Sequence, residues 1–196
     1  MIKTIIFDLA EVILTGFYGV ERFLTNELNL EANKIKSMLQ GAEYKLFMEG
    51  KINEEDFWSR VITRNNWDIK IDLLKRAIRA NFQEIEGTRK IIEDLKEKGY
   101  ELVLLSDHSK EWIDYCSSKF DYHHLFDYVQ YSYQVKACKI DRVSFDNLLR
   151  EIKRKPENCL FIDDNEKNLK VAESLGIRVI QFLNPNQLDK DLAKVL

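Results

Sequence analysis

The segment IIFDLAEV, residues 5 to 12, decides the fold prediction. Its apolar run is too short for a helix and apolar enough to be covered on both faces, which is typical of a buried parallel strand. The run ends in a carboxylate at Asp8, and two positions further on stands Ala10, which carries only a methyl group. The segment therefore predicts a core strand that presents a carboxylate at its carboxyl end.

Four later segments have the same character, and amphipathic segments with helical spacing lie between them. The expected strands are 4–9, 101–106, 128–132, 159–163 and 178–182, and the expected helices are 88–98, 110–119, 142–153 and 166–175. Strands that alternate with helices predict an α/β fold with a doubly wound parallel sheet.

One interval, residues 15–82, interrupts this alternation and contains no convincing strand. Apolar residues recur there at helical spacing: Val20, Leu24, Ile35, Met38, Leu39, Trp58, Val61 and Ile62. We expect several short helices inserted after the first strand, whose aromatic residues form a core of their own. The predicted domains are thus a core of residues 1–14 and 83–196 and a helical unit of residues 15–82.

Composition excludes several classes of protein. The chain has 196 residues, of which 45% are hydrophobic and 32% charged, as expected for a soluble globular domain with an insertion. A net charge of -3 argues against a nucleic-acid binder, and no apolar run approaches the roughly 18 residues of a membrane helix. Cys116, Cys138 and Cys159 are odd in number and form no CxxC motif, which indicates reduced thiols in a cytoplasmic protein.

Polar side chains stand at the ends of the predicted strands, where ligands bind in open α/β sheets. The first strand ends at Asp8, the second at Ser106 and the fourth at Asp163 and Asp164, while Lys139 lies between the third and fourth strands. An aspartate or serine at a single strand end usually caps a helix or a turn. Their joint placement in order on successive strand ends is what indicates a common site.

Crowded carboxylates repel one another and raise each other's pKa unless a cation neutralises them. A hard divalent ion with oxygen ligands, Mg²⁺ above all, suits such a cluster. It would leave Asp8 ionised and direct a phosphoryl group toward it, while Lys139 and Ser106 hold the phosphate oxygens.

Four motifs in this order carry a resemblance to a known family. IIFDLAEV, LLSD, SYQVKACKID and CLFIDDNEKNLKVAESLGI resemble the four motifs of the haloacid dehalogenase-like (HAD) hydrolases. The last is the most specific, with a strand, paired aspartates and a helix whose Ala-x-x-x-Gly-Ile ending leads into the next strand. The resemblance spans the whole chain, because the helical insertion stands where that family has its C1 cap, and FMEGKINEEDFW is similar to part of such a cap.

The resemblance implies a Rossmann-like core in which the first strand lies beside the fourth. It also implies phosphoryl transfer through an aspartyl-phosphate on Asp8, with Mg²⁺ as cofactor and a small phosphorylated substrate. The implied metal ligands are Asp8, Ala10 through its backbone carbonyl, Asp163 and Asp164, and the implied phosphate ligands are Ser106, Asp107 and Lys139.

Ala10 is the main departure from the family pattern. Most phosphatases of this family have a second aspartate there, which serves as general acid and base, a role worth roughly 10² to 10⁴ in rate. Its loss matters less when the leaving oxygen is stabilised on its own, as in a sugar 1-phosphate. IIFDLAEV is closest to the FDLG-x-V form of a branch that includes glucose-1-phosphate phosphatases. The sequence therefore predicts a Mg²⁺-dependent phosphatase, with a sugar 1-phosphate as one candidate substrate.

Other interpretations stay open at this stage. Glu11 or His108 would be the nearest substitutes for the missing acid. The chain would alternatively be a catalytically impaired HAD-fold protein that serves as a ligand-binding or interaction module. A 2-haloacid dehalogenase also tolerates a non-acidic residue at Ala10, but its chemistry needs no metal and gives no reason for the Asp163–Asp164 pair. The sequence does not indicate an oligomeric state.

Overall fold

The computed structural model describes residues 1–196 apart from residues 17–18, 29, 31–34 and 36–40. Met38 and Leu39, for which helical spacing predicts a helix, lie outside the described residues.

Five parallel strands form the sheet in the order β3-β2-β1-β4-β5. Their bounds are β1 Thr4–Phe7, β2 Glu101–Ser106, β3 Tyr128–Tyr131, β4 Cys159–Asp163 and β5 Arg178–Gln181. Ile6 is in register with Val103 of β2 and with Phe161 of β4. The α/β prediction is confirmed, and β1 lies beside β4 as the resemblance implied.

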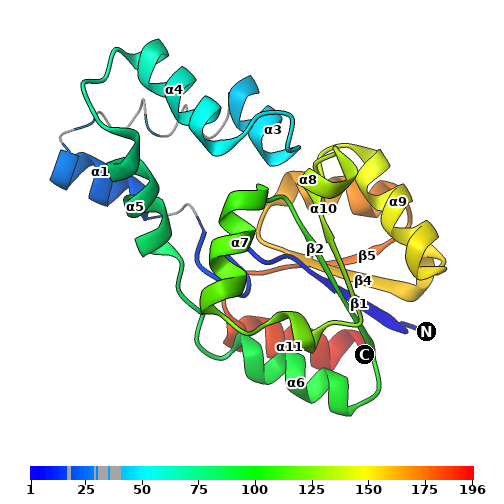
Figure 1. Cartoon of the computed structure of the whole chain (residues 1–196). Coiled ribbons are helices and arrows are strands. Elements are labelled where there is room, and N and C mark those ends of the chain that lie inside the picture. The colour runs from blue at the N-terminus through cyan, green and yellow to red at the C-terminus, as the bar shows by residue number, and fades with distance from the viewer. Residues whose placement is uncertain (17–18, 29, 31–34, 36–40) are drawn as a thin grey trace.

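Helices cover both faces of this sheet (Figure 1). Ile5 and Phe7 belong to a core shared with α6 (Thr88–Glu97), α7 (Lys110–Lys119) and α11 (Pro185–Val195). Ile6 belongs to a second core, shared with α9 (Arg142–Ile152) and α10 (Glu166–Ser174). Alternate residues of one strand therefore enter opposite cores, which explains why the strand reads as continuously apolar.

Some elements were not predicted. These are the helix α11, the short helix α8 (Ser132–Val135) and the 3-10 turns η1 (His123–Leu125) and η2 (Pro156–Asn158). The start of α11 could have been predicted, because Asn184 followed by Pro185 is typical of a helix N-terminus. In the structure the Asn184 side chain accepts a hydrogen bond of 2.9 Å from the Gln187 N–H. The prediction also extended the first strand to Leu9, whereas β1 ends at Phe7.

Between β1 and α6 lie four described helices, as predicted for this interval. They are α1 Val20–Leu28, α3 Ala42–Met48, α4 Glu54–Asn65 and α5 Ile71–Asn81. The segments entering and leaving this interval pair with each other, since Ile85 N donates to Ile13 O at 2.9 Å and Thr15 N donates to Gln83 O at 2.8 Å. The division into two domains at 15–82 stays a prediction.

The aromatic residues of the insertion do not form a separate core. Phe47, Phe57 and Trp58 are fully buried, but their cluster is continuous with the core on one face of the sheet. The Phe47 ring stands edge-on to Trp112 of α7, with centroids 5.0 Å apart. The insertion is therefore packed onto the rest of the chain through shared apolar contacts.

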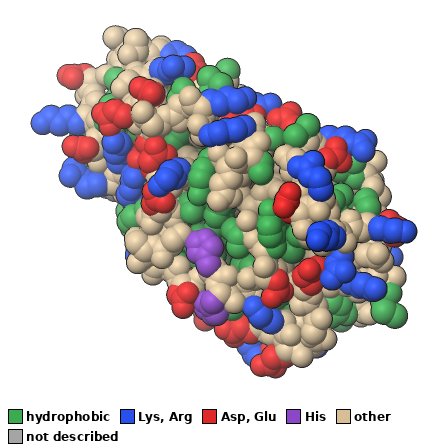
Figure 2. Space-filling model, turned by 45° about the vertical axis from the view of Figure 1, so that its right-hand side comes forward, with side chains coloured by type: hydrophobic (Ala, Val, Ile, Leu, Met, Phe, Trp, Pro, Cys, Tyr) green, Lys and Arg blue, Asp and Glu red, His purple; other side chains and the backbone are tan. Residues whose placement is uncertain are grey.

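Acidic and basic side chains are interspersed over the face shown in Figure 2, in keeping with the small net charge. In the part of the chain that the structure describes, no helix is both long and apolar enough to cross a membrane.

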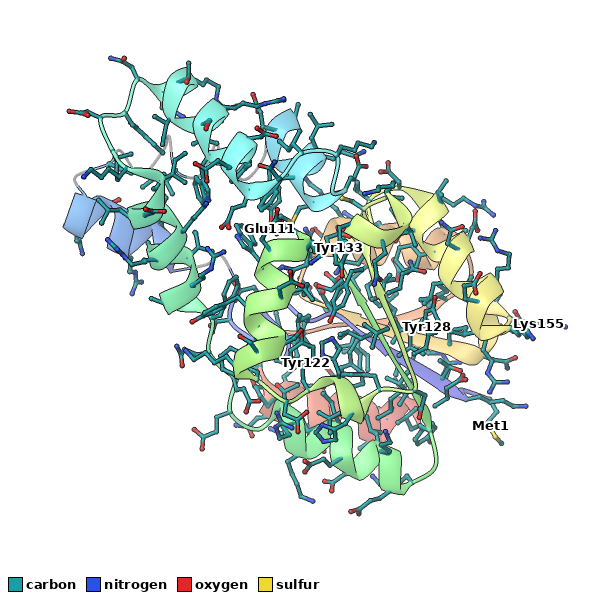
Figure 3. The ribbon with its side chains drawn as sticks, viewed as in Figure 1. Met1, Glu111, Tyr122, Tyr128, Tyr133 and Lys155 are labelled. Atoms are coloured by element: carbon teal, nitrogen blue, oxygen red, sulfur yellow. The ribbon has the colours of Figure 1, made fainter. Side chains whose placement is uncertain are left out.

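A buried carboxylate, Glu54, joins the insertion to α7. Arg79 of α5 binds it through two nitrogens at 2.6 and 2.8 Å, and the Trp112 indole N–H donates to it at 2.8 Å. The backbone N–H of Glu54 donates to Glu111 at 3.1 Å, at the end of α7 nearest α4 (Figure 3). Burial alone would raise the pKa of Glu54, but the hydrogen bonds from Arg79 and Trp112 outweigh it and lower that pKa.

We expect Glu54→Ala to lower the free energy of unfolding by about 3 kcal/mol, because it leaves the Arg79 guanidinium and the Trp112 N–H without their buried partner. Glu55→Ala is the matched control, since Glu55 also pairs with a cation of α5, Lys75 at 2.5 Å, but its side chain is 61% exposed. That variant should lose less than about 1 kcal/mol. Urea denaturation of both variants measures the difference, and equal losses would contradict a specific role for Glu54.

Candidate functional site

Three carboxylates converge at the carboxyl edge of the sheet. Asp8 follows β1, while Asp163 ends β4 and Asp164 follows it. Because Phe7 is in register with Ile162, the two strand ends lie side by side, and one oxygen from each carboxylate lies within 4.8 Å of the others. Asp8 and Asp163 are buried and Asp164 is half-buried, so the cluster opens outward on the Asp164 side.

The Lys139 side chain lies between two of these carboxylates. Its Nζ is 2.5 Å from Asp8 Oδ2 and 2.6 Å from Asp163 Oδ2, and the residue is only 1% exposed. Burial would lower the pKa of Lys139, but the carboxylates Asp163 and Asp8 outweigh it and raise that pKa well above its ordinary value. Lys139 is therefore a permanently charged ammonium inside the site.

Asp107 fixes the loop that carries Lys139. Both of its carboxylate oxygens accept the backbone N–H of Lys139, at 2.9 and 3.1 Å. Burial raises the pKa of Asp107 to about 6, against the opposing effect of Lys139. In the structure the Asp107 side chain thus orients the lysine.

Backbone and side-chain amides orient the other carboxylates. The Leu9 N–H donates to Asp8 Oδ1 at 2.7 Å, and the Asn165 N–H donates to Asp163 Oδ1 at 2.7 Å. The Asn168 side-chain amide donates to both oxygens of Asp163 at 3.2 Å. Asn168 was not predicted as a site residue, although an asparagine on the inner face of the helix after paired aspartates was a signal for it.

One ammonium does not compensate all of this negative charge. Burial, together with Asp163 and Asp164, raises the pKa of Asp8 well above its ordinary value in spite of Lys139. Burial and Asp163 raise the pKa of Asp164 to about 6. A cluster of oxygen ligands that still disfavours its own ionisation fits a hard divalent cation on chemical grounds.

Ser106 and Ala10 stand at the same edge. Ser106 ends β2 fully buried, and its hydroxyl has no hydrogen-bond partner among the described residues, which suits a site that receives an oxyanion. Ala10 forms an isolated bridge with Leu14, but the hydrogen bonds there join Glu11 N to Leu14 O and Leu14 N to Leu9 O. This pairing does not use the Ala10 carbonyl.

The two substitutes considered for the missing acid have structural roles. Glu11 adopts a left-handed backbone conformation with φ 60°, and its carboxylate accepts the Gly16 N–H at 2.8 Å, which closes the loop after β1. His108 is buried against Phe82 and Trp112, and burial lowers its pKa to about 3. An imidazole that is neutral at pH 7 has no acidic proton to give.

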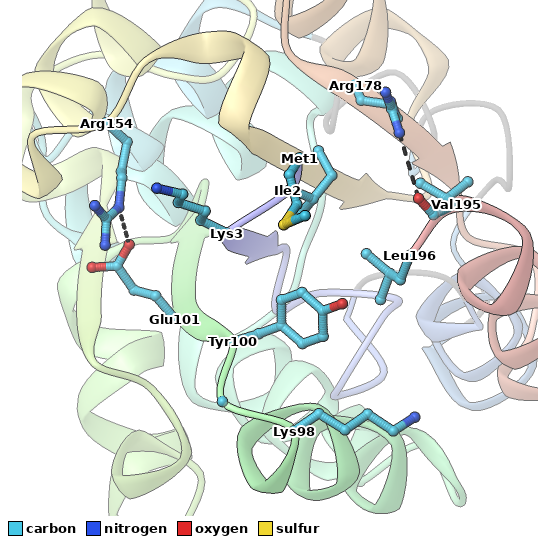
Figure 4. A pocket seen from close by; sticks show the side chains of 11 residues that line it. Met1, Ile2, Lys3, Lys98, Tyr100, Glu101, Arg154, Arg178, Val195 and Leu196 are labelled. Carbon is cyan, nitrogen blue, oxygen red and sulfur yellow. Dashed lines mark hydrogen bonds and ion pairs between the residues drawn. The ribbon is translucent and has the colours of Figure 1, made fainter.

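A separate hollow of about 490 Å³ lies at the opposite edge of the sheet (Figure 4). Lys3, Glu101, Arg154 and Arg178 are among its lining residues, and Glu101 accepts a hydrogen bond of 2.8 Å from Arg154. Because it lies at the amino ends of the strands, it is distinct from the carboxylate cluster.

Comparisons with known proteins agree with this geometry. The chain is 25% identical to the D-ribitol-5-phosphate phosphatase of Bacteroides thetaiotaomicron, over all of this chain and 99% of that protein. The fold is similar to a HAD family enzyme of the same species, solved with magnesium and inorganic phosphate, with a TM-score of 0.76, 22% identity and coverage of 94% and 96%. It is also similar to a predicted HAD-like family hydrolase of Porphyromonas gingivalis, with a TM-score of 0.81, 24% identity and coverage of 100% and 98%.

Residues 5–182 match the haloacid dehalogenase-like hydrolase family, a range that begins within β1 and extends just past β5. The match includes the ends of β1, β2 and β4 and the loop that carries Lys139. The chain belongs to the haloacid dehalogenase-like hydrolase family.

Proposed function

We propose that this hydrolase is a Mg²⁺-dependent phosphatase that cleaves a small phosphorylated metabolite through an aspartyl-phosphate on Asp8. The observation that carries the proposal is the convergence of Asp8, Asp163 and Asp164 around the buried Lys139 ammonium. The phosphatase name of the Bacteroides relative and the magnesium and phosphate bound by the solved enzyme support it.

In this proposal the metal ligands are Asp8, the Ala10 carbonyl, Asp163 and Asp164. When bound, Mg²⁺ would supply positive charge that keeps the carboxylates ionised and withdraws charge from the phosphoryl oxygens.

Ser106 and Lys139 would bind the phosphate. A carboxylate repels a phosphate dianion, so Asp107 would contribute its backbone N–H while its side chain keeps holding the Lys139 loop. Residues 15–82 would act as a C1-type cap.

The chemistry balances in two steps. A carboxylate oxygen of Asp8 attacks phosphorus, the bond from phosphorus to the ester oxygen breaks, and the departing oxygen takes a proton from water, which leaves hydroxide. A second water then attacks phosphorus and the bond from phosphorus to the Asp8 oxygen breaks, which releases inorganic phosphate and restores the Asp8 carboxylate. The proton that this second water loses neutralises the hydroxide. The hydrogen bond from Leu9 N–H and the ion pair with Lys139 hold Asp8 in one orientation for the attack.

Ala10 cannot protonate the departing oxygen, and this limits the substrates. We therefore propose a preference for esters with a stabilised leaving oxygen, such as a sugar 1-phosphate. The relative is named for D-ribitol 5-phosphate. Cleavage of that ester would release a primary alkoxide, which is more basic than the leaving oxygen of a sugar 1-phosphate. An aspartate-to-alanine variant of the solved Bacteroides enzyme was also obtained in complex with magnesium and inorganic phosphate.

We also propose a cytoplasmic location, where thiols stay reduced. The buried free thiols Cys116, Cys138 and Cys159 support it. The net charge of -3 likewise supports a small-molecule substrate in preference to a nucleic acid.

Asp8→Asn should abolish phosphate release from p-nitrophenyl phosphate and from sugar phosphates, because an amide is a very poor nucleophile. Wild-type release should stop when EDTA removes Mg²⁺ and return when Mg²⁺ is added in excess. The measurement is a phosphate assay on a panel that includes matched 1-phosphates and 6-phosphates, with a preference for the 1-phosphates expected. A wild-type protein that is inert on the whole panel would refute the enzyme proposal and favour a binding or interaction module.

Ala10→Asp should raise kcat on alkyl phosphates by roughly 10-fold or more, because it supplies a general acid at a position that now carries a methyl group. The gain on p-nitrophenyl phosphate should be small, since its leaving group needs no proton. Equal gains on both ester types would show that Asp at this position acts in another way.

Asp164→Asn should weaken Mg²⁺ binding by about 10-fold or more, as measured by calorimetry without substrate. Asp146→Asn serves as the control, because that carboxylate lies on the surface of α9 and pairs only with the exposed Arg142 in the described structure. Similar Mg²⁺ affinities for both variants would contradict the proposed ligand set.

A further inference from the structure

The segments that follow two neighbouring strands, β2 and β3, are bonded to each other beside the site. Ser106 ends β2 in register with the last residue of β3. Beyond it, the Asp107 carboxylate accepts the Lys139 N–H at 2.9 Å. The next residue along the chain, His108, donates its backbone N–H to Ser132 Oγ at 2.9 Å. Both residues after Ser106 are therefore held by the segment that begins at Ser132 and ends at Lys139.

The Ser132 hydroxyl also reaches the insertion. It donates to Met48 O at 2.6 Å, at the end of α3. The other acceptor near it, His108 O, is 3.4 Å away, so its single proton goes to Met48 O while its oxygen accepts the His108 N–H. Ser132 is 1% exposed, which leaves bulk water little access to these bonds. One buried hydroxyl thus joins α3 to the loop that follows Ser106.

A glycine allows α3 to lie this close. Gly50 has φ +61°, and a Cβ at that position would lie 3.0 Å from both the Lys136 Nζ and the Tyr133 Cβ. Lys136 Nζ donates to Gly50 O at 2.9 Å. Tyr133 is labelled beside α7 in Figure 3. The end of α3 and the segment after β3 are therefore in contact at backbone distance, and neither shifts far without breaking these bonds.

The position of Ser106 matters because its hydroxyl is a proposed phosphate contact. The residue is fully buried, and its hydroxyl has no hydrogen-bond partner among the described residues. The backbone of residues 106–108 therefore has to hold this hydroxyl in place. A misplacement of about 1 Å in a binding group costs a large factor in binding or rate. The bond between His108 N–H and Ser132 restrains this backbone two residues from Ser106.

We propose that Ser132 is a positioning residue for phosphate binding. Through one hydroxyl it sets the end of β2 relative to α3, so that a phosphate bound at Ser106 and α3 in its observed position stabilise each other. A hydroxyl that only satisfied the buried His108 N–H would stabilise the fold and leave the phosphate affinity unchanged. The inference rests on the phosphate-binding part of the proposed function, and it adds a residue that links this binding to the insertion.

The test compares Ser132→Ala with Ser144→Ala, its matched control. Ser144 is likewise 1% exposed, but its hydroxyl has no hydrogen-bond partner among the described residues. Calorimetry with inorganic phosphate in excess Mg²⁺ should show binding about tenfold weaker than wild type for Ser132→Ala and unchanged for Ser144→Ala. On p-nitrophenyl phosphate, the KM of Ser132→Ala should rise by a similar factor while kcat falls less than about threefold.

Hydrogen exchange measures the same link from the side of the insertion. Because coupling between two sites is reciprocal, saturating phosphate should slow exchange of the backbone amides of residues 42–50 about tenfold in wild type. In Ser132→Ala, phosphate should slow this exchange by about threefold or less. Urea denaturation checks that both serine variants are folded under the assay conditions.

Two results would overturn the inference: equal phosphate affinities of Ser132→Ala and Ser144→Ala, or exchange in residues 42–50 of the wild type that does not respond to phosphate. The second result needs no variant, so it decides the matter even where Ser132→Ala fails to fold. A wild type that binds phosphate but hydrolyses no ester would overturn the phosphatase function and leave this inference standing. A wild type that binds no phosphate would overturn both.

Discussion

The ion pairs of the buried Lys139 with Asp8 and Asp163 are the interaction on which the site depends. An ammonium that is 1% exposed is retained only where charge partners offset its desolvation, and here two carboxylates do so at 2.5 and 2.6 Å. Asp107 in turn holds the lysine backbone. This arrangement explains why the carboxyl ends of β1 and β4 stay together although each carries negative charge.

The same loop links the site to the insertion. The Met48–Gly50 turn accepts hydrogen bonds from both Ser132 and Lys136, and Glu54 bonds α7 a few residues later. The helices that would close over a substrate are therefore tied to the segment that positions Lys139. In physical terms, a shift of α3 and a shift of the loop that carries Lys139 act on one connected structure.

The strand pattern and the polar strand ends were readable from the sequence because both follow from local chemistry. Buried parallel strands are short and apolar, and a sheet brings its carboxyl ends to one edge, so the common location of Asp8, Ser106 and Asp163 at that edge could be predicted before any contact was known. The sequence did not reveal the role of Glu54, because its partners Arg79 and Trp112 lie far away along the chain. Asn168 was missed although its partner Asp163 is close in sequence. Asp107 was predicted as a phosphate ligand, and only the structure shows that its side chain is occupied with Lys139. The shared aromatic core could not be predicted from the sequence, because residue spacing does not show whether Phe47 packs within residues 15–82 or against Trp112.

The central claim is that Asp8 becomes phosphorylated, and chemical trapping tests it most directly. Borohydride reduces an aspartyl-phosphate to homoserine, which mass spectrometry of the peptide containing residue 8 detects. The account predicts conversion at Asp8 that requires both Mg²⁺ and a turning-over phosphate ester. Phosphate release without any conversion at Asp8 would contradict it.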